Sequence, residues 1–180
     1  PIVYIGANPN VGWGDYADLD NREAGRIATK ALIDAGHKKI LHLSGPTEVN
    51  SSAVDRVEGY KDALREAGIR VRTDMIMPGD YGPLGAERGI TAALESGVPF
   101  TAIFAASTAM GNKASELLAA RGVKIPDDIS IAAINREPED MTRDRRVTTI
   151  EQPLYAIGTA AAEMLMQRIG GSDAAPQTRL

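Results

Sequence analysis

Short apolar runs alternate with amphipathic segments along most of the chain, and this alternation limits the possible folds more than any other feature. The apolar runs have the length of buried strands, and the segments between them repeat apolar residues at every third or fourth position, as a helix face does. Strands separated by helices predict a parallel sheet with helices on both faces, a doubly wound α/β fold. The expected strands are Pro1–Ile5, Ile40–Leu43, Asp74–Met77, Thr101–Ala105 and Ile129–Ile134.

Capping residues and glycines divide the intervening segments into helices. Asp20 and Asn21 can cap a first helix that runs to about Ala35, and Ser51 and Ser52 can cap a second. Three further helices are expected at about residues 83–96, 109–121 and 153–169, with a loop over 7–19 and a short extended segment at 148–150.

Composition excludes several classes of function. The 180 residues carry a formal charge of −4, too little positive charge to hold DNA phosphates. There is no cysteine, and two histidines alone cannot build a zinc centre. No apolar run approaches the roughly 20 residues of a membrane helix, and no signal peptide opens the sequence. We therefore expect a cytoplasmic setting and no membrane partner, with any DNA contact made by residues outside this sequence.

Motifs that mark catalysis are missing. The sequence has no G-x-S-x-G elbow, no G-x-x-x-x-G-K-[ST] loop and no H-E-x-x-H. Gly12–Gly14 lacks the third glycine of a dinucleotide-binding loop. Glu137, Glu139 and Asp140 can in principle ligate a hard cation, but the neighbouring arginines favour a solvated loop. We expect no enzyme, no cofactor and no metal site.

Three residues near expected strand ends can contact a ligand, because ligands of doubly wound sheets bind beyond the carboxyl ends of the strands. Arg56 lies early in a helix that follows a strand and offers paired N–H donors, or it pairs on the surface with Asp55 or Glu58. Tyr81 can stack on a sugar or base face, or simply occupy a turn. Asn135 follows the most apolar strand, where a polar side chain is expected to face solvent or ligand.

Several stretches of the chain, taken together in their order and spacing, resemble the effector-binding core of LacI/GalR transcriptional regulators. Each stretch alone is a weak signal, and the specific signal is the combination along nearly the whole length. The stretches are Asp20–Asn21 with Ala24–Gly25, Leu32–Ile40, Arg56–Tyr60, Pro99–Ala105, Val123–Ile131, Val147–Pro153, Gly158 and Ala161.

This resemblance implies a two-lobed fold like that of type I periplasmic binding proteins, with the effector in the cleft. Residues 1–18 would belong to the N-lobe, 19–151 would form a complete C-lobe, and 152–180 would return to the N-lobe. The DNA-binding head would lie outside this sequence. In such regulators an effector that prefers one arrangement of the lobes changes the spacing of two heads in a dimer.

The resemblance also implies partners. A homodimer would form through C-lobe surfaces near Gly82–Ala86, Asn112–Leu118 and Glu139–Arg143, and operator DNA would bind only through the head. The main alternative function is a periplasmic sugar-binding protein of an ABC transporter, which has the same fold. The Val147–Pro153 stretch favours the regulator, and an enzyme on a doubly wound sheet is a more distant alternative.

Three of the family's ligand positions match this sequence. Arg56 occupies the position of the cleft arginine, Ser52 that of a frequent effector contact, and Tyr81 that of the stacking aromatic.

Three other ligand positions depart from the family's pattern. Gly6 and Asn135 stand where members usually carry Asp, and Ser107–Thr108 replaces Asn-Asp. With fewer acids and the same arginine, we expect an anionic effector, such as a sugar phosphate or carboxylate, to supply the missing charge. Two alternatives stay open: the arginine pairs with another acid, such as Asp15 or Asp80, and the effector is neutral; or the cleft has lost effector binding.

Overall fold

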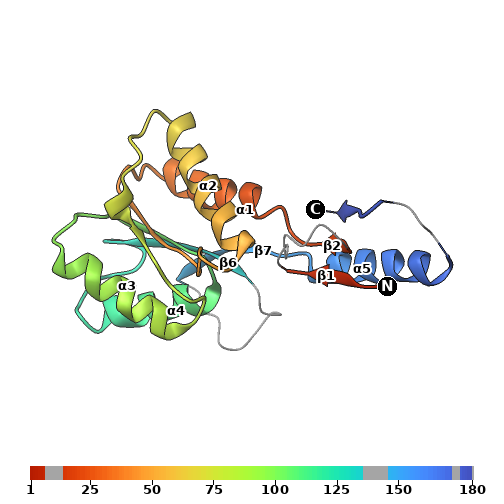
Figure 1. Ribbon diagram of the computed structural model, residues 1–180. Helices are drawn as coiled ribbons and strands as arrows, with labels where there is room; N and C mark the ends of the chain where they lie inside the picture. Colours follow the sequence, from red (N-terminus) through yellow and green to blue (C-terminus); the bar gives the residue numbers. More distant parts are fainter. Residues whose placement is uncertain (7–13, 136–145, 172–174, 180) are drawn as a thin grey trace.

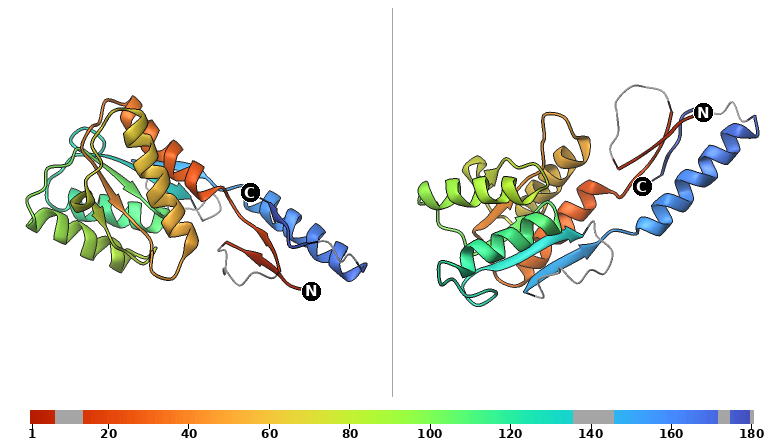
Figure 2. Two further views of the ribbon diagram at one scale, coloured as in Figure 1. Left: turned by 45° about the horizontal axis from the view of Figure 1, so that its top comes forward. Right: turned by 90° about the horizontal axis from the view of Figure 1, so that it is seen from below.

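The computed structural model describes residues 1–6, 14–135, 146–171 and 175–179 and contains two parallel sheets (Figure 1). The five-stranded sheet carries helices on both faces and forms what we call the large lobe. The three-stranded sheet and one helix form the small lobe, which lies to one side of the large lobe and holds both chain ends (Figures 1 and 2).

The large sheet is wound in two directions from its middle. Its strand order is β4-β3-β5-β6-β7, and every neighbouring pair is parallel. The chain adds β4 on one side of β3 and then crosses to the other side for β5, so the switch point lies between β3 and β5. The predicted doubly wound fold is confirmed. The strands are β3 (Ile40–Leu43), β4 (Ile76–Met77), β5 (Ala102–Ala105), β6 (Ser130–Asn135) and β7 (Val147–Glu151).

Alternating side chains of the strands build two separate cores. Ile40 and Phe104 pack with one pair of helices, whereas Leu41 and Ile103 pack with the other pair. The first pair is α1 (Asn21–Asp34) and α2 (Ser51–Glu66), and the second is α3 (Pro83–Glu95) and α4 (Thr108–Ala119). A single 3-10 turn, Thr73–Met75, leads into β4.

The helix starts follow the sequence closely, with one exception. Asp20 caps α1 by accepting a hydrogen bond from the backbone N–H of Glu23 at 2.9 Å, as expected. For α2 the capping residue is Asn50, whose side chain accepts from the N–H of Ala53 at 2.9 Å. The expected caps, Ser51 and Ser52, are the first two residues of the helix, which leaves the Ser52 hydroxyl available for other contacts.

The small lobe contains two strands that the sequence did not reveal. Residues 15–17 form β2 (Asp15–Ala17) within a segment that was predicted to be loop. It lies between β1 (Val3–Ile5) and the other unpredicted strand, β8 (Thr178–Arg179), and α5 (Leu154–Ile169) packs against β1 and β2. The first strand was predicted to be buried, but Ile5 is 58% exposed. Short strands with charged ends carry too weak a periodicity to be recognised.

A histidine is enclosed in the core between the sheet and α2. The ring of His42, on β3, is fully buried and stacks on the rings of Phe104 and Tyr60 at centroid distances of 4.3 and 5.2 Å. Its Nδ1 lies 3.0 Å from the carbonyl oxygen of Phe104, while Nε2 has no hydrogen-bond partner among the described residues. Burial, opposed only by the Phe104 contact, lowers the pKa of His42 to about 4, so the ring is neutral at pH 7.

Candidate functional site

Two glycines bring α1 and α2 into backbone contact and thereby place Arg56. A Cβ on Gly25 of α1 would lie 2.5 Å from the carbonyl oxygen of Arg56, and a Cβ on Gly59 of α2 would lie 1.9 Å from the carbonyl oxygen of Arg22. Neither space admits a methyl group. The helices therefore cross at the turn that carries Arg56, and the crossing directs this side chain inward, where it is only 3% exposed.

Arg56 contacts two neutral acceptors at the switch point of the sheet. Its Nε donates a 2.8 Å hydrogen bond to Oδ1 of Asn21, and its Nη1 donates to the carbonyl oxygen of Ala106, which directly follows β5. The guanidinium carbon lies 5.4 Å from the centre of the Tyr81 ring, in range for a cation–π interaction. A ligand site of a doubly wound sheet is expected at this position.

Tyr81 has a strained backbone. Its φ is +66°, the left-handed region that large side chains rarely adopt. The hydroxyl donates to Oδ1 of Asn50 at 3.2 Å, and the ring lies so close to Gly45 that a Cβ there would be 2.4 Å from it. Strain of this kind persists only where surrounding contacts impose it, and it is frequent at ligand-binding sites.

Ser107 ties Tyr81 to the start of α4. Its hydroxyl donates to the carbonyl oxygen of Tyr81 at 2.7 Å, and the same oxygen accepts from the N–H of Met110 as the helix cap. The backbone of Asn135 ends β6 and pairs with Glu151; the Asn135 side chain lies outside the described part of the chain.

Ser52 and Gly6 meet where the two lobes join. The Ser52 hydroxyl lies 3.0 Å from the carbonyl oxygen of Gly6 and 3.1 Å from Oδ2 of Asp18. That carboxylate oxygen also accepts from the hydroxyl of Tyr16 at 2.8 Å and from Nδ2 of Asn21 at 2.6 Å. Burial, followed by the nearby Asp18 carboxylate, raises the pKa of Tyr16, so its phenol stays protonated and donates to that carboxylate.

The structure therefore joins five of the six expected site residues in one chain of contacts. Ser107 reaches Tyr81, Tyr81 reaches Arg56, and the Asn21–Asp18 pair continues to Ser52 and Gly6. Neither Asp18 nor the role of Asn21 as an arginine acceptor was predicted from the sequence. Asn21 lay in a recognised stretch, but Asp18 carried no local signal.

The two acids considered as partners of the cleft arginine serve other arginines. Asp15 binds Arg168 of α5 through two hydrogen bonds of 2.8 Å, and Asp80 binds Arg88 at 2.8 Å. Arg88 and the backbone N–H groups of Gly82 and Gly85 lower the pKa of Asp80, which keeps it ionised in that pairing.

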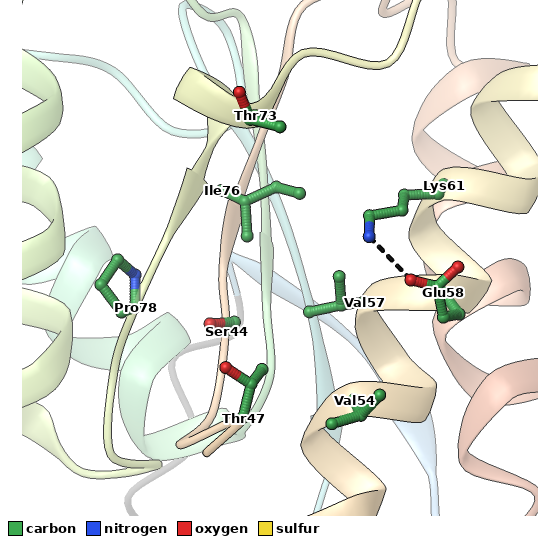
Figure 3. Close-up of a pocket in the computed structure, with 9 residues that line it drawn as sticks. All are labelled: Ser44, Thr47, Val54, Val57, Glu58, Lys61, Thr73, Ile76 and Pro78. Atoms are coloured by element: carbon green, nitrogen blue, oxygen red, sulfur yellow. Dashed lines mark hydrogen bonds and ion pairs between the residues drawn. The ribbon is translucent and has the colours of Figure 1, made fainter.

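A pocket of about 400 Å³ lies elsewhere, between α2 and the edge strand β4 (Figure 3). Lys61 and Glu58, both on α2, form a 2.7 Å ion pair on the helix side of the pocket. Its α2 residues lie on a different side of the helix from Arg56, and none of the six expected site residues lines it. It is therefore distinct from the site at the switch point. The lining residues are Ser44, Thr47, Val54, Val57, Glu58, Lys61, Thr73, Ile76 and Pro78.

Two other kinds of site receive no support within the described ranges. No group of three or more His, Asp or Glu side chains there is arranged to hold a metal ion. The expected acidic stretch at Glu137, Glu139 and Asp140 lies outside those ranges. None of the described helices combines the length and the apolar character of a membrane-spanning segment.

Comparison with known proteins places the chain among transcriptional regulators. Residues 29–180 match the family described as periplasmic binding protein-like domain. The regulator CelR of Thermobifida fusca is 30% identical over 161 residues, 89% of this chain and 47% of CelR. Catabolite control protein A of Priestia megaterium is 34% identical over 166 residues, 92% of this chain and 50% of that protein. The chain thus spans about half the length of the curated relatives it matches.

Solved structures agree with this placement. The CelR–cellobiose complex superimposes with a TM-score of 0.89 at 30% identity, covering 99% of this chain and 55% of that one. A LacI family regulator from Mycobacterium smegmatis gives a TM-score of 0.88 at 29% identity, covering 98% of this chain and 64% of that one. These relatives are regulators, not transport proteins or enzymes. The chain belongs to the LacI family of transcriptional regulators and has the fold of their periplasmic-binding-protein-like effector domain.

Proposed function

We propose that the chain is the effector-sensing core of a LacI-type regulator, in which a sugar-like molecule bound next to Arg56 controls operator binding. The observation that carries the proposal is a buried arginine at the switch point of the sheet, beside an aromatic ring and two hydroxyl-bearing side chains. A guanidinium can donate to sugar oxygens, and an aromatic ring can stack on the apolar face of a sugar. CelR, a relative, has been solved with cellobiose.

Each lobe has its own role in the proposed mechanism. Residues 1–18 and 152–180 form the N-lobe portion and 19–151 the C-lobe, so that an effector between them selects one lobe arrangement. Operator DNA, in the cytoplasm, is bound through a separate head, and the core pairs with a second copy through its C-lobe. The core binds its effector without catalysing a reaction. The transporter alternative is not favoured, because the matched relatives are regulators.

Replacing Arg56 with methionine tests the proposed site. Isothermal calorimetry with cellobiose should show binding to the unchanged protein and a loss of about 10- to 100-fold in the variant, because hydrogen bonds from a charged donor contribute roughly 1.5–3 kcal/mol. Arg65→Met is the matched control, since Arg65 lies on the same helix but is 56% exposed and pairs with Asp62. Circular dichroism checks that each variant is folded.

Two outcomes would contradict the proposal. One is the absence of a thermal shift with every member of a panel of neutral and phosphorylated mono- and disaccharides, because a ligand of the native state must raise its stability. The other is saccharide binding that Arg56→Met leaves unchanged.

A further inference from the structure

We propose that Asp18 is a specificity-determining residue of this effector site: it orients Asn21 and Arg56 and presents a carboxylate oxygen to a hydroxyl of a neutral effector. The inference rests on the proposed function, since it assigns the charge preference of that same site. It replaces the expectation of an anionic effector, which rested on a count of acids at the family's usual positions.

Asp18 collects donors from both lobes. Its side chain is only 7% exposed, and Oδ2 accepts hydrogen bonds from Tyr16 of β2 and Asn21 of α1. The Ser52 hydroxyl of α2 lies 3.1 Å from the same oxygen and shares its proton between this oxygen and the Gly6 carbonyl, so these contacts hold the carboxylate in position. A buried carboxylate needs such partners, because burial without them is costly. Asp18 is therefore held in a fixed position at the junction between the lobes.

Asn21 links Asp18 to Arg56 by two hydrogen bonds. Its amide nitrogen donates to Asp18 at 2.6 Å, and its amide oxygen accepts from Nε of Arg56 at 2.8 Å. An amide that donates at one end and accepts at the other can take only one orientation in this series of hydrogen bonds. The carboxylate, amide and guanidinium thus form a continuous hydrogen-bonded series, in which a carboxylate lies one residue beyond an acceptor of the arginine.

The second oxygen of Asp18 is the one available to a ligand. Among the described residues, every hydrogen bond to this side chain ends on Oδ2, so Oδ1 keeps its acceptor capacity. Within the described ranges, His42 Nε2 is the fully buried side-chain polar atom that lacks a hydrogen-bond partner. Asp18 Oδ1 is not among such enclosed atoms, and the residue keeps 7% of its surface exposed. A hydroxyl can donate to this oxygen, whereas a phosphate or carboxylate group would be repelled.

The test compares one sugar with and without a charge. Calorimetry with cellobiose and cellobiose 6′-phosphate should show at least about tenfold tighter binding of the neutral sugar to the unchanged protein. Asp18→Asn keeps the size and one acceptor oxygen but removes the charge, so it should weaken cellobiose binding and strengthen phosphate-sugar binding until the preference is lost or inverted. Asp62→Asn, which changes an α2 acid paired with Arg22 and Arg65, should leave the ratio unchanged.

The ratio of the two affinities separates a specificity role from a purely structural one, because general loosening of the site weakens both ligands alike. Tighter binding of the phosphorylated sugar to the unchanged protein overturns the inference while leaving the proposed function intact, and this measurement needs no variant. A ratio that Asp18→Asn does not alter also overturns it. If no saccharide of the panel, neutral or phosphorylated, binds to the unchanged protein, the inference and the proposed function fail together.

Discussion

Replacing Gly59 with alanine is expected to destabilise the large lobe by about 3 kcal/mol or more, although alanine favours helix by about 1 kcal/mol over glycine. The new Cβ would lie 1.9 Å from the carbonyl oxygen of Arg22 and 2.7 Å from the backbone nitrogen of Arg26. Both are backbone atoms, so α1 and α2 must move apart along their whole contact. Urea unfolding at pH 7.5 measures the change in the free energy of unfolding.

Gly158→Ala provides the matched control for this result. Gly158 lies inside α5, and a Cβ there meets nothing within 4 Å. The substitution should therefore stabilise the protein slightly, by roughly 0.5–1 kcal/mol. A loss of stability similar to that of Gly59→Ala would show that crowding at the α1–α2 crossing is not the cause. Because Arg56 lies at that crossing, Gly59→Ala should also weaken ligand binding at the proposed effector site.

Acidification from pH 7 to pH 4 is expected to remove about 3 kcal/mol of stability through His42 alone. Burial lowers the pKa of this residue from 6.5 to about 4, and the Arg56 charge adds to the effect. Between these two values the unfolded chain binds a proton that the folded chain does not, so falling pH favours unfolding. The contribution is complete above about pH 6.5 and is lost as the pH falls toward 4.

The pH dependence is measured by urea unfolding at intervals from pH 7.5 to 4.0. His42→Phe, which retains the stacking between Tyr60 and Phe104 without a titrating group, should show a shallower loss of stability with falling pH. His37→Asn is the control for removing a histidine as such, because His37 lies beyond the end of α1 and contacts Thr101. A slope that stays the same in His42→Phe would show that other groups cause the acid sensitivity.

Much of the fold was predictable because its signals are local. The apolar runs marked β3, β5 and β6, and the three-to-four spacing of residues such as Ala24, Ala28 and Leu32 marked the buried face of α1. The small lobe was less predictable. A strand as short as β2 has no recognisable period, and it exists because β1 and β8 pair with it.

The candidate site was predicted in part, because some of its residues follow strand ends and others do not. The rule that ligands bind beyond strand ends pointed to Arg56, Tyr81 and Asn135, and the family resemblance added Ser107. The structure joins Arg56, Tyr81 and Ser107 by contacts. The rule could not find Asp18, which precedes a helix in the segment between the lobes. Nor could it show that Ser107 both caps α4 and binds the Tyr81 backbone.

The sequence by itself determined which segments are strands and helices and at which edge of the sheet a ligand would bind, because periodicity and chain order are local or topological properties. Only the tertiary structure decided the partners of Arg56. Asn21 is 35 positions away in sequence, and its contact depends on two helices touching at Gly25 and Gly59. Residue spacing does not encode which atoms meet across such a crossing, and that meeting connects Arg56 through Asn21 to the carboxylate of Asp18.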